Sequence, residues 1–281
     1  MTKIRCILRK FATTLIMVAA WALLLPLAAC TKEPSENGMI TMTTKASEVS
    51  FTVAGAEDIV IDWGDGKKSN VSDASFLDER SGSFGFSHTF SGNKSEHRIT
   101  ITGDNIESFI SVGGNELTSL DVSRSTKLTF LECRWNQLTA LDVSRNTALK
   151  TLSCDNNQLT TLDVSKNTAL KELSIRNNQL TTLDVSHNTA LIILGCPNNR
   201  LTSVKMGAAN PELLALVDLR NNQLTGSALN DLFRELPDKT KNVEDFNEEI
   251  HSGSIIILGN PGEFDCDRDI ARKRGWRITL R

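Results

Sequence analysis

The sequence predicts a mixed α+β chain built around a solenoid of short, stacked coils. Three observations carry this prediction: asparagines recur every 21 residues through the middle of the chain, leucines hold fixed positions around each of them, and the flanking segments lack the repeat. A period of this length is typical of repeat architectures. Only the last interval differs, at 23 residues, in the series Asn115, Asn136, Asn157, Asn178, Asn199 and Asn222.

Each unit reads L-x-x-L-x-C-x-x-N-x-L, which matches the general leucine-rich-repeat pattern. Side chains two residues apart on a strand point to one face, so Leu131 and Cys133 should both face the core. One coil cannot bury its own apolar face, and we therefore expect six units to stack through short parallel strands. Residues 106–226 are predicted to form these leucine-rich repeats, in which each asparagine bonds backbone groups of the bend.

The N-terminus has the layout of a secretory signal. A basic start precedes an apolar run over 11–27 and the small residues Ala28 and Ala29. With Cys30 this segment resembles a bacterial lipobox, which implies a signal peptide over 1–29, a lipid on Cys30 and a polar tether over 30–38. Removing 1–29 takes away four positive charges and no negative one, so the formal net charge goes from −3 to −7. An uncleaved anchor helix is the alternative.

Residues 39–105 predict a small antiparallel β domain, because apolar residues alternate in runs separated by Gly, Asp, Asn and Ser. The phrases Trp63-Gly64-Asp65-Gly66 and His88-Thr89-Phe90 resemble the PKD-type immunoglobulin-like β-sandwich, with phenylalanine where tyrosine is common. Asp62 and Asp65 could bind calcium, although aspartates in turns more often bond their own backbone.

Residues 227–281 predict an α/β C-terminal cap that shields the last coil. Leu229, Leu232, Phe233 and Leu236 have helical spacing and Pro237 ends that helix. A short strand over 255–258, a last helix over 265–275 and a terminal strand from residue 276 follow.

The cysteines of the repeats share one inward position. We expect Cys133, Cys154 and Cys196 to be free thiols that act as small buried hydrophobes, as stacked parallel side chains poorly match the S–S torsion of a disulfide. A bridge stays the alternative, and the thiol state of Cys266 is open. The 21-residue unit, the core cysteine and the phrase L-D-V-S-x-N-T resemble the cysteine-ladder repeats of the internalin family of bacterial surface proteins. That resemblance implies a binding role without naming a partner.

No motif of an enzyme is present: the sequence has no G-x-S-x-G, H-E-x-x-H, Walker or dinucleotide-binding pattern, and its four histidines are scattered. We therefore expect no catalytic residues, cofactor or metal. The acidic mature chain argues against nucleic acid as a partner.

Specificity is expected on the outward residues of the strands, where repeat scaffolds hold partners on a concave face. Phe130 and Trp135, as an aromatic pair beside Arg134 and Arg176, resemble the composition of a binding hot spot. The expected partner-binding residues are Phe130, Glu132, Arg134, Trp135, Ser153, Asp155, Glu172, Ser174, Arg176, Ile193, Asp218 and Arg220.

The function predicted from these features is that of a monomeric, lipid-anchored bacterial surface protein whose repeats bind a protein in adhesion or cell-surface interaction. We expect it on the outer membrane facing outward, with the periplasmic face as the alternative. A structural or glycan-binding envelope lipoprotein without a protein ligand is the second candidate.

Overall fold

The structure, a computed structural model, describes residues 38–56, 58–78, 82–92, 96–207, 209–210, 212–242 and 253–279. These residues all belong to one compact unit. The signal peptide expected over 1–29, the lipidated Cys30 and the tether as far as residue 37 lie outside the described residues. Within the described ranges, no helix has the length and apolar character needed to cross a membrane.

An N-terminal β domain is formed by two antiparallel sheets. One contains β1 (Met39–Thr44), β3 (Val60–Asp62), β4 (Lys68–Asn70) and β7 (His97–Thr102), and the other begins with β2 (Glu48–Ala54), β5 (Phe76–Asp78) and β6 (Ser83–Thr89). A single 3-10 turn, η1 (Val71–Asp73), joins β4 to β5. Between the sheets, the Phe51 ring lies 5.6 Å from that of Trp63 and 6.1 Å from that of Phe86, centroid to centroid. The alternating apolar residues of this segment therefore build a buried core.

Both sheets of the β domain continue into the first coil of the solenoid. Strand β2 pairs antiparallel with β8 (Ser108–Ile110), and β1 pairs antiparallel with β9 (Leu117–Asp121). The first ladder asparagine, Asn115, has no preceding coil to bond. Instead its Oδ1 accepts from the Ser50 N–H at 2.8 Å, and its Nδ2 donates to the Ser50 carbonyl at 2.6 Å. The β domain thus closes the N-terminal end of the repeat stack.

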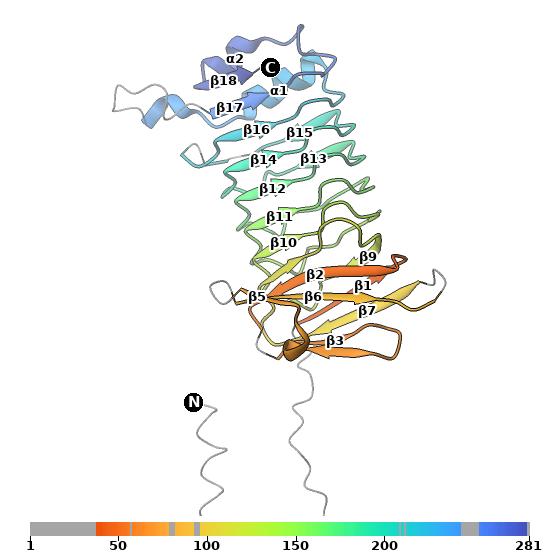
Figure 1. Ribbon diagram of the computed structural model, residues 1–281. Helices are drawn as coiled ribbons and strands as arrows, with labels where there is room; N and C mark the ends of the chain where they lie inside the picture. The colour runs from red at the N-terminus through yellow and green to blue at the C-terminus, as the bar shows by residue number, and fades with distance from the viewer. Residues whose placement is uncertain are drawn as a thin grey trace, which may run out of the picture. The chain divides into compact units, whose positions relative to one another are not determined.

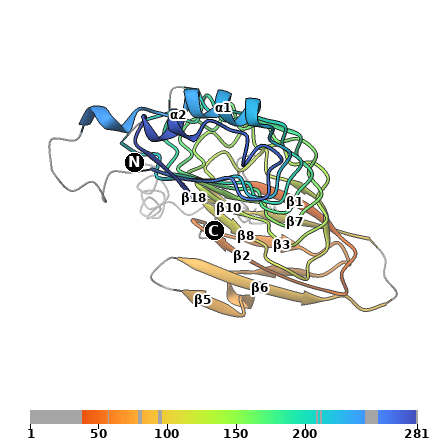
Figure 2. The same ribbon diagram turned by 90° about the horizontal axis from the view of Figure 1, so that it is seen from above.

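The solenoid stacks its coils through one parallel strand each, as Figure 1 shows in side view and Figure 2 from above. Equivalent residues pair in register, so that Leu131 faces Leu152 and Leu152 faces Leu173. A second pair of strands, β13 (Thr182–Asp184) and β15 (Ser203–Lys205), forms a separate two-stranded sheet. The stacked strands after β8 are β10 (Phe130–Glu132), β11 (Thr151–Ser153), β12 (Glu172–Ser174), β14 (Ile193–Gly195) and β16 (Leu216–Asp218).

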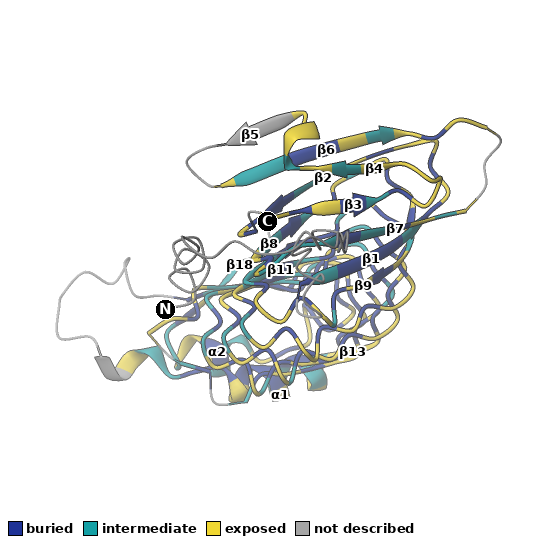
Figure 3. Ribbon diagram, turned by 90° about the horizontal axis from the view of Figure 1, so that it is seen from below, coloured by how far each residue is buried: buried dark blue, intermediate teal, exposed yellow. Residues whose placement is uncertain are grey.

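These coils confirm the predicted leucine-rich-repeat solenoid. The leucines that define the pattern are buried, with Leu131, Leu152 and Leu194 fully inaccessible to solvent. Figure 3 shows the same division, with buried strands along the core and exposed residues at the bends. Hydrophobic residues of the β domain, the coils and the cap form one continuous cluster, so stability is shared between neighbouring layers.

A seventh coil lies where the sequence predicted only a cap. Strand β17 (Gly253–Ile256) pairs parallel with β16, and Asn260 donates to the carbonyls of Leu219 (2.9 Å) and Ile257 (2.8 Å). Asn260 is therefore a ladder asparagine, and the count of six units was one too low. The repeat was hidden because 38 residues, including a helix, separate Asn222 from Asn260, and no leucine stands eight residues before Asn260.

The remaining cap elements include two α-helices and a terminal strand, and the second α-helix is shorter than the one predicted over 265–275. Helix α1 (Gly226–Glu235) buries Leu229, Leu232 and Phe233, and the Thr225 hydroxyl caps it by accepting from the Ala228 N–H. A short 3-10 helix, η2 (Lys239–Asn242), comes next. Helix α2 (Arg268–Arg272) leads to β18 (Trp276–Thr279), which pairs with β17. The Trp276 indole is buried and donates to the Pro237 carbonyl at 2.9 Å, so the last strand is pinned to the end of α1.

The two aspartates of the Trp63–Gly66 turn bond their own backbone. Oδ1 of Asp62 accepts from the Gly64 N–H, and Oδ1 of Asp65 accepts from the Lys67 N–H. The second oxygens pair with Lys68 and with His88, whose Nε2 lies 2.9 Å from Asp65 Oδ2. This is the turn geometry that was favoured over a calcium site.

Candidate functional site

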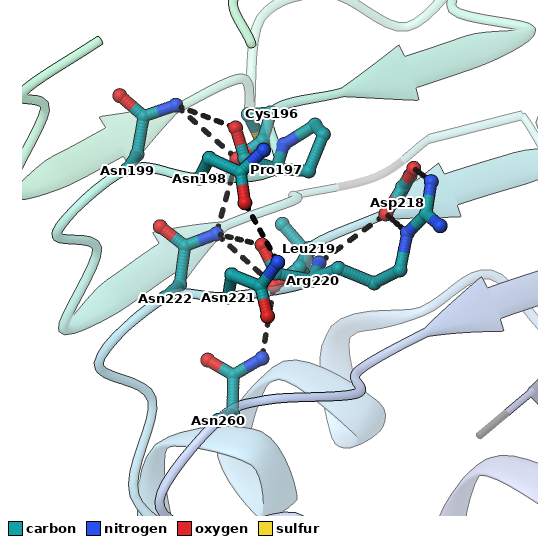
Figure 4. A network of polar contacts seen from close by, with 10 residues as sticks. All are labelled: Cys196, Pro197, Asn198, Asn199, Asp218, Leu219, Arg220, Asn221, Asn222 and Asn260. Carbon is teal, nitrogen blue, oxygen red and sulfur yellow. Dashed lines mark hydrogen bonds and ion pairs between the residues drawn. The ribbon is translucent and has the colours of Figure 1, made fainter. Parts of the chain in front are cut away.

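The asparagine ladder fixes where the outward residues stand. Asn157 donates from Nδ2 to the carbonyls of Cys133 (2.9 Å), Cys154 (3.1 Å) and Asp155 (3.3 Å), and its Oδ1 accepts from the Leu138 N–H at 3.0 Å. Figure 4 shows the same arrangement at the C-terminal end of the stack, for Asn199, Asn222 and Asn260. Since every bend is held alike, outward side chains of successive coils lie in columns.

A groove of about 420 Å³ lies across the parallel strands β10, β11, β12, β14 and β16. Two of the twelve expected binding residues, Trp135 and Arg220, do not line it, although Arg220 is ion-paired to Asp218, which does. The expected residues that line the groove are Phe130, Glu132, Arg134, Ser153, Asp155, Glu172, Ser174, Arg176, Ile193 and Asp218.

The groove exists because the middle outward position is small in three successive coils. That position is Glu132 in the first strand of the groove and Asp218 in the last, but Ser153, Ser174 and Gly195 lie between them. The floor is therefore recessed relative to its two acidic ends. Gly195 was not among the binding residues expected from the sequence.

Gly195 is not required by the backbone. Its φ is not in the left-handed region, and an added Cβ would lie 3.8 Å from Ser174 Oγ and 3.9 Å from the Leu173 carbonyl oxygen, which is ordinary contact. Glycine weakens a strand, and in strands it often marks a site where a ligand or another backbone approaches closely. The missing side chain thus opens space above the sheet without serving the fold.

Three of the four acidic residues that line the groove are more buried than expected for outward positions, and the fourth, Glu172, is exposed. Glu132, Asp155 and Asp218 are only 6–8 % exposed. Glu132 forms an ion pair with Arg134, and Asp218 Oδ2 lies 2.7 Å from Nη2 of Arg220. These contacts hold the side chains down against the sheet, so they are not simply solvated, and the Asp218 carboxylate raises the pKa of Arg220.

The two aromatic residues expected on this face stand in different parts of their coil. Phe130 begins β10, whereas Trp135 lies in the bend three residues after β10 ends, and no ring contact joins them among the described residues. Phe130 is half-buried in the groove, whereas Trp135 is 61 % exposed just outside it. Trp135 also has a φ of 58°, which a bulky side chain rarely adopts.

Beneath the groove the cysteines are inert. Cys133, Cys154 and Cys196 are fully buried free thiols, and Cys266 is a buried free thiol in the cap. Burial raises the pKa of Cys133 to about 12, and the pKa of Cys154 lies well above its ordinary value for the same reason. Such thiols remain protonated and are poor nucleophiles. In the part of the chain that the structure describes, no three His, Cys, Asp or Glu side chains cluster closely enough to hold a metal ion.

Comparison with known proteins agrees with the repeat pattern. The family described as Leucine Rich repeats (2 copies) matches residues 147–188. None of the curated proteins matches the chain. Two solved structures of Listeria monocytogenes proteins are similar to it. The functional domain of InlJ, whose description notes a cysteine ladder, is 24% identical over 62% of this chain with a TM-score of 0.32.

The second structure, an internalin (inlF), is 14% identical over 62% of this chain and 82% of its own, with a TM-score of 0.25. The chain spans about half, 49%, of the InlJ domain. The pattern match and the stacked parallel strands agree in position, and the central part of the chain is a leucine-rich-repeat solenoid.

Proposed function

We propose that the chain is a bacterial surface protein, lipid-anchored at Cys30, whose groove holds a protruding segment of a partner protein. The observation that carries the binding role is Gly195, a glycine that the fold does not need at the floor of a hollow of about 420 Å³. Fold stability alone would favour a residue with a side chain at this position, since glycine in the middle of a strand lowers the stability of the fold.

The lining of the groove favours a protein over a sugar. It combines apolar side chains, among them Phe130, Ile193 and Leu216, with charged and hydroxyl groups. Glycan sites are usually built on exposed aromatic faces, and the one strongly exposed tryptophan of the described residues, Trp135, does not line the hollow. Mixed apolar and charged surfaces with recessed floors suit side-chain anchors from a partner.

The test is a selection of binding peptides from a displayed library of random sequence, with the intact chain as bait. Gly195→Leu fills the floor and should abolish binding of the selected peptides. Thr182→Leu, which adds the same side chain at an exposed position of β13, should leave it unchanged. If the selected peptides bind both variants with the same affinity as they bind the parent chain, the groove is not the binding surface.

Anchoring and orientation are tested separately. Cys30→Ala should move the protein from the membrane fraction to the soluble fraction, because lipid attachment at this cysteine is the proposed anchor. Protease added to intact cells should remove the repeats if they face outward. Protection from protease until the outer membrane is opened would place them on the periplasmic side.

A further inference from the structure

Asp155 differs from Glu132 and Asp218, the other two buried acidic residues of the groove, in having no cation. Its Oδ1 accepts from the Ser174 hydroxyl and from the Arg176 backbone N–H, both at 2.7 Å. Its Oδ2 has no partner among the described residues, although the residue is only 7 % exposed. Glu132 and Asp218, by contrast, are each neutralised by an arginine of their own coil.

Among the described residues, Asp155 lacks an ion pair even though an arginine stands next to it in the stack. Arg176 stands beside Asp155 in the same column, one coil further along, yet no ion pair joins the two side chains, and the Arg176 side chain is exposed. A mostly buried carboxylate without a cation lowers the stability of a folded chain. Asp155 lines the hollow, so a partner seated there would come next to this residue.

We propose that the groove receives a lysine or arginine side chain from the partner segment, and that its cationic head donates to Oδ2 of Asp155. This inference rests on the proposed function and specifies the chemistry of the partner. Ser153, Ser174 and Gly195 leave room for the aliphatic stem beside the carboxylate. Charge-assisted bonds of this type are among the strong ones in protein interfaces.

The charges that remain in the groove agree with a basic partner. Besides the pairs Glu132–Arg134 and Asp218–Arg220, the lining of the groove holds two carboxylates, of Asp155 and Glu172, and one guanidinium, of Arg176. The surplus is negative, so a basic side chain is steered toward the hollow and an acidic one is disfavoured. A single carboxylate gives a metal ion too few ligands, and a side-chain cation needs only one.

Asp155→Asn separates this role from folding. An asparagine at this position keeps an oxygen for the Ser174 hydroxyl and the Arg176 N–H, and it removes the uncompensated charge. We expect the thermal midpoint to stay the same or rise. Asp142→Asn is the matched control for the binding measurement only, because it removes one carboxylate from an exposed turn outside the groove.

The experiment measures the affinity of library-selected peptides for the intact chain and its variants. Peptides that bind the parent chain but not Gly195→Leu should be enriched in lysine or arginine. Asp155→Asn should weaken them by about tenfold or more, while Asp142→Asn should change affinity by less than about twofold. Replacing the basic residue of the peptide with glutamine should weaken its binding to the parent chain by the same factor. The same replacement should cause no further loss of affinity for the Asp155→Asn variant.

The outcomes distinguish the two proposals. Peptides that lose binding to Gly195→Leu but bind Asp155→Asn as tightly as the parent chain would overturn the basic-side-chain inference and leave the groove as the binding site. Peptides that also bind Gly195→Leu would overturn both. A selection in which no peptide prefers the parent chain over Gly195→Leu would count against both as well.

Discussion

Trp135 occupies the backbone position that Asn156 occupies one coil later, and both are left-handed, with φ angles of 58° and 55°. The same position has a positive φ in every coil, where the other residues are glycine or asparagine. These are Gly114, Asn177, Asn198, Asn221 and Gly259. Asparagine and glycine tolerate this conformation, whereas a bulky side chain in it is strained by about 1–3 kcal/mol.

The strain at Trp135 leads to a prediction about stability. Trp135→Asn should raise the free energy of unfolding by about 1 kcal/mol, because asparagine suits the left-handed region. The introduced amide could also extend the side-chain pairing seen one coil further along, where Asn177 donates to Asn156 at 2.7 Å. Urea denaturation followed by circular dichroism measures the change.

If the exposed indole also contacts the partner, Trp135→Asn should weaken binding of groove-selected peptides while it stabilises the fold. Trp135→Ala serves as the control, as it removes the ring but leaves a residue that still disfavours a positive φ. A lower unfolding free energy for Trp135→Asn would mean that the indole supports the fold instead of straining it.

The regular part of the fold could be predicted because the same residue type makes the same hydrogen bonds at the same position of every coil. A ladder asparagine makes up to four bonds to buried backbone groups, and only the longer glutamine side chain supplies the same donors and acceptors. A second column of asparagines that bond buried backbone carbonyls was nonetheless not predicted. Asn167 donates to the carbonyls of Val143 and Asn146, both at 2.9 Å, and Asn146 and Asn188 do the same in their coils. Its period is visible in the phrase S-x-N-T, but no role was assigned to this asparagine from the sequence.

Asn157→Ala should lower the free energy of unfolding by about 1–3 kcal/mol, because it leaves the Cys133 carbonyl and the Leu138 N–H buried without these partners. Asn167→Ala should cost a similar amount for the same reason. Thr160→Ala, at an exposed position of the same coil, should cost less than about 0.5 kcal/mol. Urea midpoints of the three variants compare these costs, and a midpoint for Asn157→Ala equal to that of the parent chain would show that the ladder bond is dispensable.

The buried cysteines give a direct readout of folding. In a chain beginning at residue 38, a thiol reagent such as Ellman's reagent should find four reactive thiols after denaturation, namely Cys133, Cys154, Cys196 and Cys266. In the folded chain the reaction should be slow at mildly alkaline pH. Burial excludes the reagent and raises the pKa of Cys133 to about 12, so little thiolate forms. Two thiols instead of four after denaturation would mean that a disulfide joins two of them.

The groove was less predictable than the repeats that carry it. The outward columns followed from the alternation of a strand, so the lining residues could be named. The depth of the groove could not, because it depends on the contrast between the small residues Ser153, Ser174 and Gly195 and the larger Glu132 and Asp218 at the two ends of their column. The pairing of charges could not be predicted either. Side-chain conformation, and not spacing along the chain, decides whether Arg176 reaches Asp155.

A further column of aspartates predicts how the solenoid responds to acid. Asp121, Asp142, Asp163 and Asp184 recur at one position, and each Oδ1 accepts from the backbone N–H of the serine two residues later, at 2.8–2.9 Å. For Asp163 the backbone N–H of Ser165 is the main cause of a pKa below the ordinary value of 3.8, and the Ser165 hydroxyl contributes as well. The pKa values of the other three are lowered by the same serine contacts.

A carboxyl whose pKa is lower in the folded chain stabilises the fold above its unfolded pKa and loses that contribution as the pH falls through the folded value. We therefore expect the thermal midpoint to be steady near neutral pH and to fall below about pH 4 as these carboxylates become protonated. Replacing Asp121, Asp142 and Asp163 together with asparagine should lower the midpoint at neutral pH and flatten its decline in acid. Glu107→Gln, which removes an exposed carboxylate outside these turns, should leave the slope unchanged. An equally steep decline in the triple variant would assign the acid sensitivity to other groups, such as Asp65, whose pKa is lowered by its hydrogen bond to His88.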